Sequence, residues 1–84
     1  MVSYLAHNKA SGQVSEGGLA ACIRWAVASV EQSQNAVIAI IKSRPGEDAR
    51  VIAEVDSNGL RWIFDGRYLA KREVTKLTRR AAHG

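Results

Sequence analysis

The sequence predicts a small α+β domain, with an antiparallel sheet of three to four strands and two helices in the order β-α-β-β-β-α. Three observations predict this class. The chain has 84 residues, the size of one domain, so residues 1–84 are expected to fold as a single unit. Two segments, one in each half, carry apolar residues at helical spacing. Between them, two alternating apolar runs flank an Asn-Gly dipeptide, which is a hairpin signal.

The first third of the chain predicts a strand, a loop and a helix. Residues 2–7 alternate as a short strand does, and the polar, glycine-rich stretch 8–18 is typical of a loop. Ser15 is the expected N-cap of a helix that runs to about Gln32. One apolar stripe of that helix consists of Leu19, Cys22, Ile23, Ala26, Val27 and Val30.

The middle of the chain predicts three strands. The run AVIAIIK, residues 36–42, is apolar on both faces and is expected to be a central strand covered on each side. The stretch 43–48 contains Pro-Gly and is a turn. A type I′ turn at Asn58-Gly59 would then pair Val55 with Trp62, Asp56 with Arg61, and Ala53 with Phe64.

The last segment predicts a short edge strand at 67–69 and a helix from about Ala70 to Ala82. The apolar face of this helix consists of Ala70, Val74, Leu77 and Ala81. Its other face is basic. Residues 1–65 hold six basic residues against seven acids, whereas residues 66–84 hold six basic residues against one acid. The sequence therefore describes a near-neutral body with a basic end, which favours an acidic partner.

Catalytic and metal chemistry lack the residues they need. The two histidines, His7 and His83, lie near opposite ends, and no Cys-x-x-Cys or His-x-x-x-His spacing occurs. Cys22 falls inside the apolar stripe of the first helix, so we interpret it as a core residue. We expect no cofactor and no enzymatic activity. The single cysteine, the absence of a signal-peptide pattern and the lack of a long apolar run favour a cytoplasmic protein away from membranes.

The candidate partner-binding residues are Arg67, Lys71, Arg72, Lys76, Arg79, Arg80, Trp25 and Tyr68. The basic residues form a cationic ridge on the outward face of the last helix, although a charged outer face is also what a solvated amphipathic helix shows. Trp25 lies at the flank of the apolar stripe of the first helix. Two interpretations of it stay open, packing at the rim of the core and an exposed contact residue. Tyr68 is ambiguous in the same way.

Two functions of different class follow from the basic end. The first is a small protein-binding regulator or inhibitor, docking on the acidic surface of a larger protein. The alanine- and arginine-rich composition suits a bacterial or phage genome rich in GC. The alternative is a DNA- or RNA-binding protein whose basic helix contacts phosphates, although helix-turn-helix, zinc-finger and RNA-recognition signatures are absent. A thin core and an edge strand also leave room for a homodimer.

Overall fold

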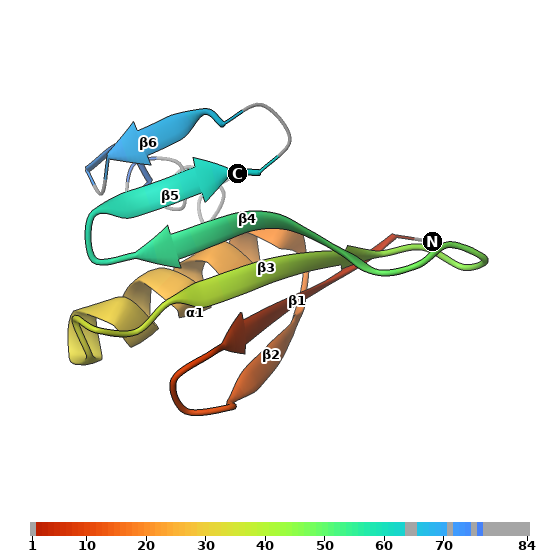
Figure 1. Cartoon of the computed structure of the whole chain (residues 1–84), viewed down its shortest axis with the longest axis horizontal. Helices are drawn as coiled ribbons and strands as arrows, with labels where there is room; N and C mark the ends of the chain where they lie inside the picture. Colours follow the sequence, from red (N-terminus) through yellow and green to blue (C-terminus); the bar gives the residue numbers. More distant parts are fainter. Residues whose placement is uncertain (1, 64–65, 71, 75, 77–84) are drawn as a thin grey trace.

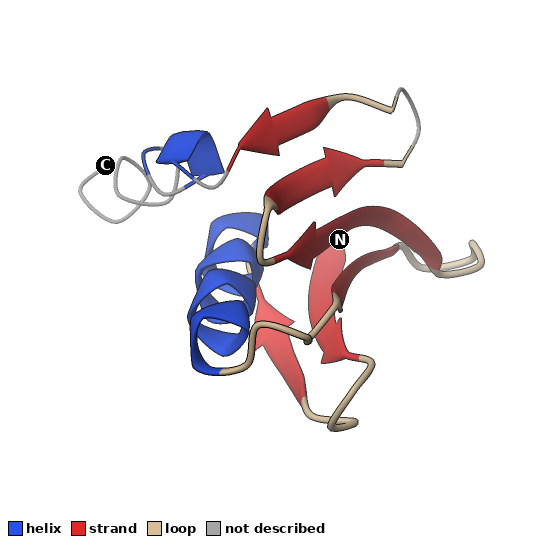
Figure 2. Cartoon of the chain, turned by 60° about the vertical axis from the view of Figure 1, so that its left-hand side comes forward, coloured by secondary structure: helices blue, strands red, loops and turns tan. Residues whose placement is uncertain are grey.

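The computed structural model describes residues 2–63, 66–70, 72–74 and 76. They form one antiparallel sheet of six strands in the spatial order β2-β1-β3-β4-β5-β6, with the helix α1 lying across one face (Figures 1 and 2). The α+β class is confirmed. The elements are β1 Ser3–Asn8, β2 Val14–Gly17, α1 Leu19–Gln32, β3 Ile38–Ser43, β4 Arg50–Asp56, β5 Gly59–Trp62 and β6 Tyr68–Ala70.

The expectation of three to four strands is wrong, because the sheet has six strands. The main addition is β2, which lies inside the stretch 8–18 that the sequence predicts as a loop. The side-chain oxygen of Asn8 accepts hydrogen bonds from the backbone N–H groups of Ala10 (2.9 Å) and Ser11 (3.3 Å). These bonds turn the chain back, so that β2 pairs with β1.

The helix α1 begins later than the sequence predicts. Ser15 is part of β2, and the N-cap is Gly18, whose cap makes no side-chain hydrogen bond. The apolar stripe itself is confirmed, since Cys22, Ile23, Ala26 and Val30 are buried against the sheet. The helix ends where the sequence predicts, at Gln32.

The core lies between α1 and one face of the sheet. Strands β3, β4 and β5 supply its largest fully buried side chains, among them Ile38, Ile40, Val55 and Leu60. We call this side of the sheet the covered face. The position of β3 between β1 and β4 confirms the predicted central strand. The expected cover on both of its sides is only half met, because α1 lies on one face alone, and we call the other the open face (Figure 2).

The β4–β5 hairpin is confirmed, but its predicted register is wrong. Asp56 pairs with Gly59, and Glu54 pairs with Arg61, so the loop consists of residues 57 and 58. The carboxylate of Asp56 accepts the N–H groups of Asn58 (2.9 Å) and Gly59 (3.2 Å), which places the turn one residue earlier. No described non-glycine residue has a positive φ, so the turn is not type I′.

This change moves the pairing by two positions, which leaves each side chain on the face that the sequence assigns to it. Trp62 lies opposite Ala53 instead of Val55, on the covered face. Arg61 pairs with the carboxylate of Glu54, not with that of Asp56. The predicted partner of Ala53, Phe64, lies outside the described residues.

The C-terminal segment confirms the predicted edge strand with a shift of one residue, since β6 spans Tyr68–Ala70. Ala70 therefore belongs to a strand and not to the last helix. Residues 72–74 and 76 are helical, and the side chain of Val74 is 2% exposed and joins the core. The inward face predicted for this helix is thus present at Val74, whereas Leu77 and Ala81 lie outside the described residues.

Candidate binding surface

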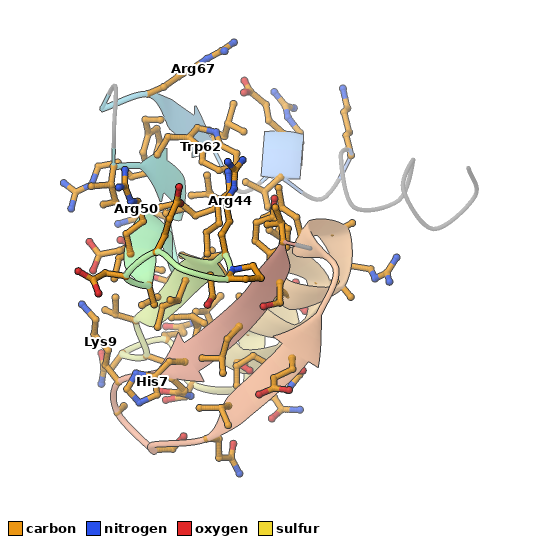
Figure 3. The ribbon with its side chains drawn as sticks, turned by 90° about the vertical axis from the view of Figure 1, so that its right-hand side faces the viewer. His7, Lys9, Arg44, Arg50, Trp62 and Arg67 are labelled. Carbon is orange, nitrogen blue, oxygen red and sulfur yellow. The ribbon has the colours of Figure 1, made fainter. Side chains whose placement is uncertain are left out.

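The basic residues predicted to bind a partner lie on the β5–β6 side of the molecule, as far as the structure describes them. Arg67 directly precedes β6 and is exposed, and Figure 3 shows its side chain pointing away from the body. Its backbone carbonyl accepts a hydrogen bond of 2.8 Å from the N–H of Trp62, which ties this end of β6 to β5. Arg72 and Lys76 are exposed helical residues. Lys71, Arg79 and Arg80 lie outside the described residues.

Tyr68 lies on the open face, in register with Arg61 of the neighbouring strand. Its hydroxyl donates a hydrogen bond of 2.6 Å to the backbone carbonyl of Asn58 in the β4–β5 turn. The side chain nevertheless remains 52% exposed. One end of the tyrosine is therefore fixed while its ring is accessible to a partner.

Trp25 belongs to α1, which covers the face of the sheet opposite the one that carries Tyr68. The thiol of Cys22 is 3.7 Å from the carbonyl oxygen of Ser15, so the Cys22 side of α1 faces β2. At 3.6 residues per turn, Trp25 is rotated about 60° from Cys22 around the helix axis. The rotation is away from Ile23, Ala26 and Val30, which face the core. It is half-buried and packs against the core. The structure thus supports rim packing, and it does not bring Trp25 together with Tyr68 and the basic end.

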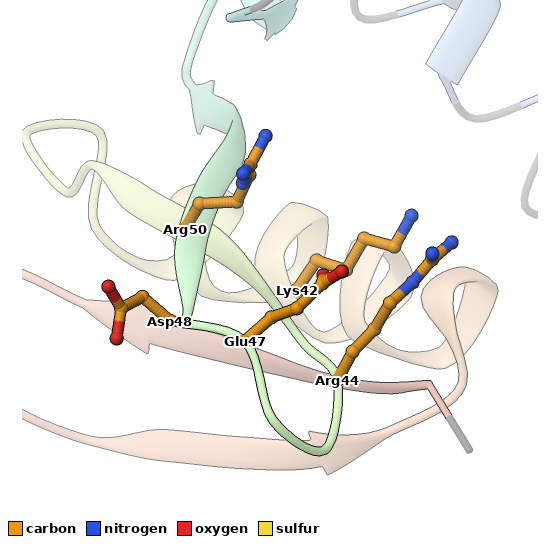
Figure 4. Close-up of a pocket in the computed structure, with 5 residues that line it drawn as sticks. All are labelled: Lys42, Arg44, Glu47, Asp48 and Arg50. Atoms are coloured by element: carbon orange, nitrogen blue, oxygen red, sulfur yellow. The ribbon is translucent and has the colours of Figure 1, made fainter.

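A second group of cations lies at the end of the β3–β4 hairpin. Lys42, Arg44 and Arg50 line a hollow of about 280 Å³, together with the acids Glu47 and Asp48. Figure 4 shows Lys42 and Arg44 extending beside each other, with Asp48 pointing to the other side of the hairpin. None of these five residues takes part in an ion pair within the described part of the chain. The sequence gives little sign of this group, because Glu47 and Asp48 offset two of its three positive charges in any count over the segment.

The open face carries an ion-pair network at its centre. The carboxylate of Glu54 receives Lys9 Nζ at 2.7 Å on one oxygen and the Arg61 guanidinium at 3.1 Å on the other. Hydrogen bonds from Lys9 and then from Arg61 lower the pKa of Glu54 below its ordinary value. Arg61 is therefore satisfied within the molecule, and the charge that this face offers to a partner is small.

The chemistry of Cys22 agrees with its interpretation as a core residue. Its side chain is 1% exposed, and burial raises the pKa of the thiol. A thiol in this state is a poor nucleophile and a poor metal ligand. No group of three or more histidine, cysteine or carboxylate side chains that could hold a metal ion occurs among the residues described.

The helical segments of the described chain are short. The longest of them, α1, has 14 residues. None has the length and the apolar content that a membrane-crossing helix needs.

Similarity to a protein of known function could indicate which partner binds this surface. Comparisons of the chain with protein-family models, with curated proteins and with solved structures find no match. What the chain binds is therefore inferred from the chemistry of its own surface.

Proposed function

We propose that the chain is a small non-enzymatic protein-binding module, a regulator or inhibitor that docks on the acidic surface of a larger protein. The docking residues lie in β6 and on either side of it. They are Arg67, Tyr68, Arg72 and Lys76, together with Lys71, Arg79 and Arg80 of the same basic segment. We leave Trp25 out of the proposed surface, because α1 lies over the covered face whereas Tyr68 lies on the open face.

One observation carries the proposal. Arg72 and Lys76 are exposed, and within the described part of the chain neither forms an ion pair. Both lie within six residues of the end of β6, the strand that presents the accessible ring of Tyr68. Tyrosine and arginine are the residue types enriched at the energetic centres of protein interfaces, and exposed positive charge speeds encounter with an acidic partner.

The test is co-purification with two variants of equal net charge. The first, Arg67→Glu/Arg72→Glu/Lys76→Glu, reverses charge at the basic end. The second, Arg24→Glu/Arg44→Glu/Arg50→Glu, reverses three exposed cations elsewhere. We expect the wild-type chain and the second variant to hold the same protein in a stoichiometric complex on gel filtration, and the first variant to lose it. Equal retention by both variants would contradict the proposal.

Nucleic-acid binding is the second candidate, and the hairpin cations favour it. Lys42, Arg44 and Arg50 add three positive side chains on a two-stranded ribbon, a shape that the major groove of DNA admits. Glu47 and Asp48 in the same hollow would repel phosphates, which is why we rank this candidate second. A fluorescence-anisotropy titration of labelled duplex DNA and single-stranded RNA separates the two. Absence of binding at about 50 mM salt excludes phosphate-driven recognition, since such binding is tightest at low salt.

A further inference from the structure

The strand β6 is one of the two edges of the sheet, and its register shows which of its backbone groups point outward. The N–H of Trp62 bonds the carbonyl of Arg67, so these two residues form a hydrogen-bonded pair. Pairs alternate along an antiparallel ladder, which makes Leu60 and Leu69 the next hydrogen-bonded pair. The backbone N–H and C=O groups of Tyr68 and Ala70 therefore point away from β5, at an edge that pairs with no further strand within the described part of the chain.

The described charged side chains around this edge are positive, with the exception of the exposed Glu73, which follows Arg72. Arg67 precedes β6, and Arg72 and Lys76 follow it. All three are exposed, and Arg72 and Lys76 form no ion pair with the described part of the chain. An extended segment pairing with Tyr68 and Ala70 would run between these cations, so carboxylates flanking its paired residues would meet positive charge at each end.

The other edge of the sheet has the opposite character. The N–H of Asn8 bonds the carbonyl of Gln13, and the same alternation directs the backbone groups of Val14 and Glu16 outward from β2. The carboxylate of Glu16 is exposed beside them. An acidic segment is thus repelled at β2 and attracted at β6.

A second copy of the chain is a poorer occupant of β6. Two β6 edges pairing with each other would bring Arg67, Arg72 and Lys76 of one copy against the same residues of its partner. Like charges placed opposite each other destabilise a strand pair. Charged residues at an edge are also a general means by which proteins prevent edge-to-edge pairing of copies.

We infer that the docking partner presents an extended acidic segment, which pairs with β6 and adds to the sheet as a seventh strand. This inference rests on the proposed function and names its mode of recognition. Backbone hydrogen bonds to Tyr68 and Ala70 supply the pairing, and the carboxylates of the segment supply the selectivity through the flanking cations. The ring of Tyr68, on the open face, covers the neighbouring side chain of the added strand.

The first experiment uses an acetylated octapeptide of alternating glutamate and valine as a probe, with the lysine-valine peptide of the same pattern as control. Backbone amide exchange of the folded chain is followed by nuclear magnetic resonance. On addition of the acidic peptide, we expect exchange at Tyr68 and Ala70 to slow by about tenfold or more, as two new backbone hydrogen bonds would require. We expect no change at Leu69, because its amide is already bonded to β5. We also expect the lysine-valine peptide to leave the exchange at Tyr68 and Ala70 unchanged.

The second experiment places proline at the edge. Ala70→Pro removes an N–H that points outward, a position where an edge strand tolerates proline. Val14→Pro makes the equivalent change at the other edge, where the N–H of Val14 also points outward. We expect Ala70→Pro to weaken binding of the acidic peptide by about tenfold and Val14→Pro to leave it unchanged. Unaltered amide spectra away from each proline show that both variants remain folded.

Several outcomes would overturn the inference. One is slower amide exchange at Val14 and Glu16 instead of at Tyr68 and Ala70. The others are equal binding of both peptides, and binding of the acidic peptide without slower amide exchange at β6. If Ala70→Pro does not fold, the exchange measurement on the wild-type chain decides alone. A failure of strand addition can be distinguished from a failure of the proposed function. A partner retained by Ala70→Pro but lost by Arg67→Glu/Arg72→Glu/Lys76→Glu leaves docking intact and removes only strand addition.

Discussion

The two faces of the sheet differ in what covers them and in which side chains they carry. The covered face packs against α1 with side chains such as Ile38, Ile40, Val55 and Leu60, each less than 2% exposed. The open face has no helix over it in the described part of the chain (Figure 2). One row across it, in strand order, consists of Val14, His7, Ala39, Glu54, Arg61 and Tyr68.

Because of this difference, the covered face determines the stability of the fold, whereas the open face is available for binding. Burial of one large apolar side chain contributes about 1.5–3 kcal/mol, whereas an exposed ion pair contributes about 0–1 kcal/mol. The covered face therefore supplies most of the free energy that keeps a chain of this size folded. The open face and the edges can change their side chains at small cost, so they are the places where a binding function can reside.

The largest expected effect is truncation on the covered face. Ile40→Ala removes a side chain that is 0% exposed, and a cavity remains where it packed. We expect a loss of about 2–5 kcal/mol in the free energy of unfolding. Ile41→Ala, one residue on and half-buried, is the matched control and should lose less than half as much. Urea unfolding followed by tryptophan fluorescence measures both, and equal losses would show that the two faces do not differ as proposed.

An intermediate effect is expected at Gly59, where the backbone approaches closely. Its φ is +149°, and a Cβ at this position would overlap the carbonyl oxygen of Leu69 in β6. We expect Gly59→Ala to cost about 1–3 kcal/mol and to loosen β6 from β5, because the side chain has no space. Gly12→Ala is the control with open space but a positive φ of 79°, so it carries only the backbone strain. Faster amide exchange at Leu69 in Gly59→Ala alone would locate the effect.

The register at Gly59 shows what the sequence could not predict. Asn-Gly is a strong local signal for a turn centred on both residues, yet Gly59 lies in β5, because the carboxylate of Asp56 holds the turn one residue earlier. The backbone of β6 also approaches Gly59 too closely for a side chain. That approach is set by a segment ten residues further along the chain, which a local pattern cannot contain. The face of each residue was nevertheless predicted correctly, since a shift of two positions preserves the alternation.

The strand β2 was not predicted from the sequence for a related reason. Its sequence, VSEG, contains one apolar residue, and Val14 is 55% exposed, so no burial pattern marks it. It forms because the side chain of Asn8 fixes the preceding turn and β1 offers a partner. The helix α1 was predictable for the opposite reason, because its inner face is buried and burial imposes the apolar period.

The same reasoning applies to the candidate site. The basic end was predictable because the charge of one segment is almost all of one sign. The cations of the β3–β4 hairpin were not predictable, because Glu47 and Asp48 offset most of their charge in a count over the segment. Only the fold shows that Lys42, Arg44 and Arg50 share a hollow. Trp25 was a candidate because of its residue type and its position at the flank of the apolar stripe, and a local pattern could not show that α1 covers the face of the sheet opposite Tyr68.

The smallest expected effect lies at the ion-pair network of the open face. Glu54→Gln keeps the shape of the side chain and removes its charge. Its partners Lys9 and Arg61 are 51% and 60% exposed, so we expect a loss of less than about 1 kcal/mol at pH 7. Because folding lowers the pKa of Glu54, its contribution is fully present above the ordinary glutamate value of about 4.3. It is lost as the pH falls through the lowered pKa of the folded state.

Urea unfolding of the wild-type chain and of Glu54→Gln at several pH values measures this contribution. The two unfolding free energies should differ at pH 7 and converge once the pH lies below the lowered pKa of Glu54, where the carboxyl group is protonated in both states. Glu31→Gln, a similar change on the exposed side of α1, is the comparison for a surface carboxylate on the helix. A difference that persists at low pH would mean that Glu54 acts through packing, in which case the open face contributes to the core and the two faces are less distinct than their side chains indicate.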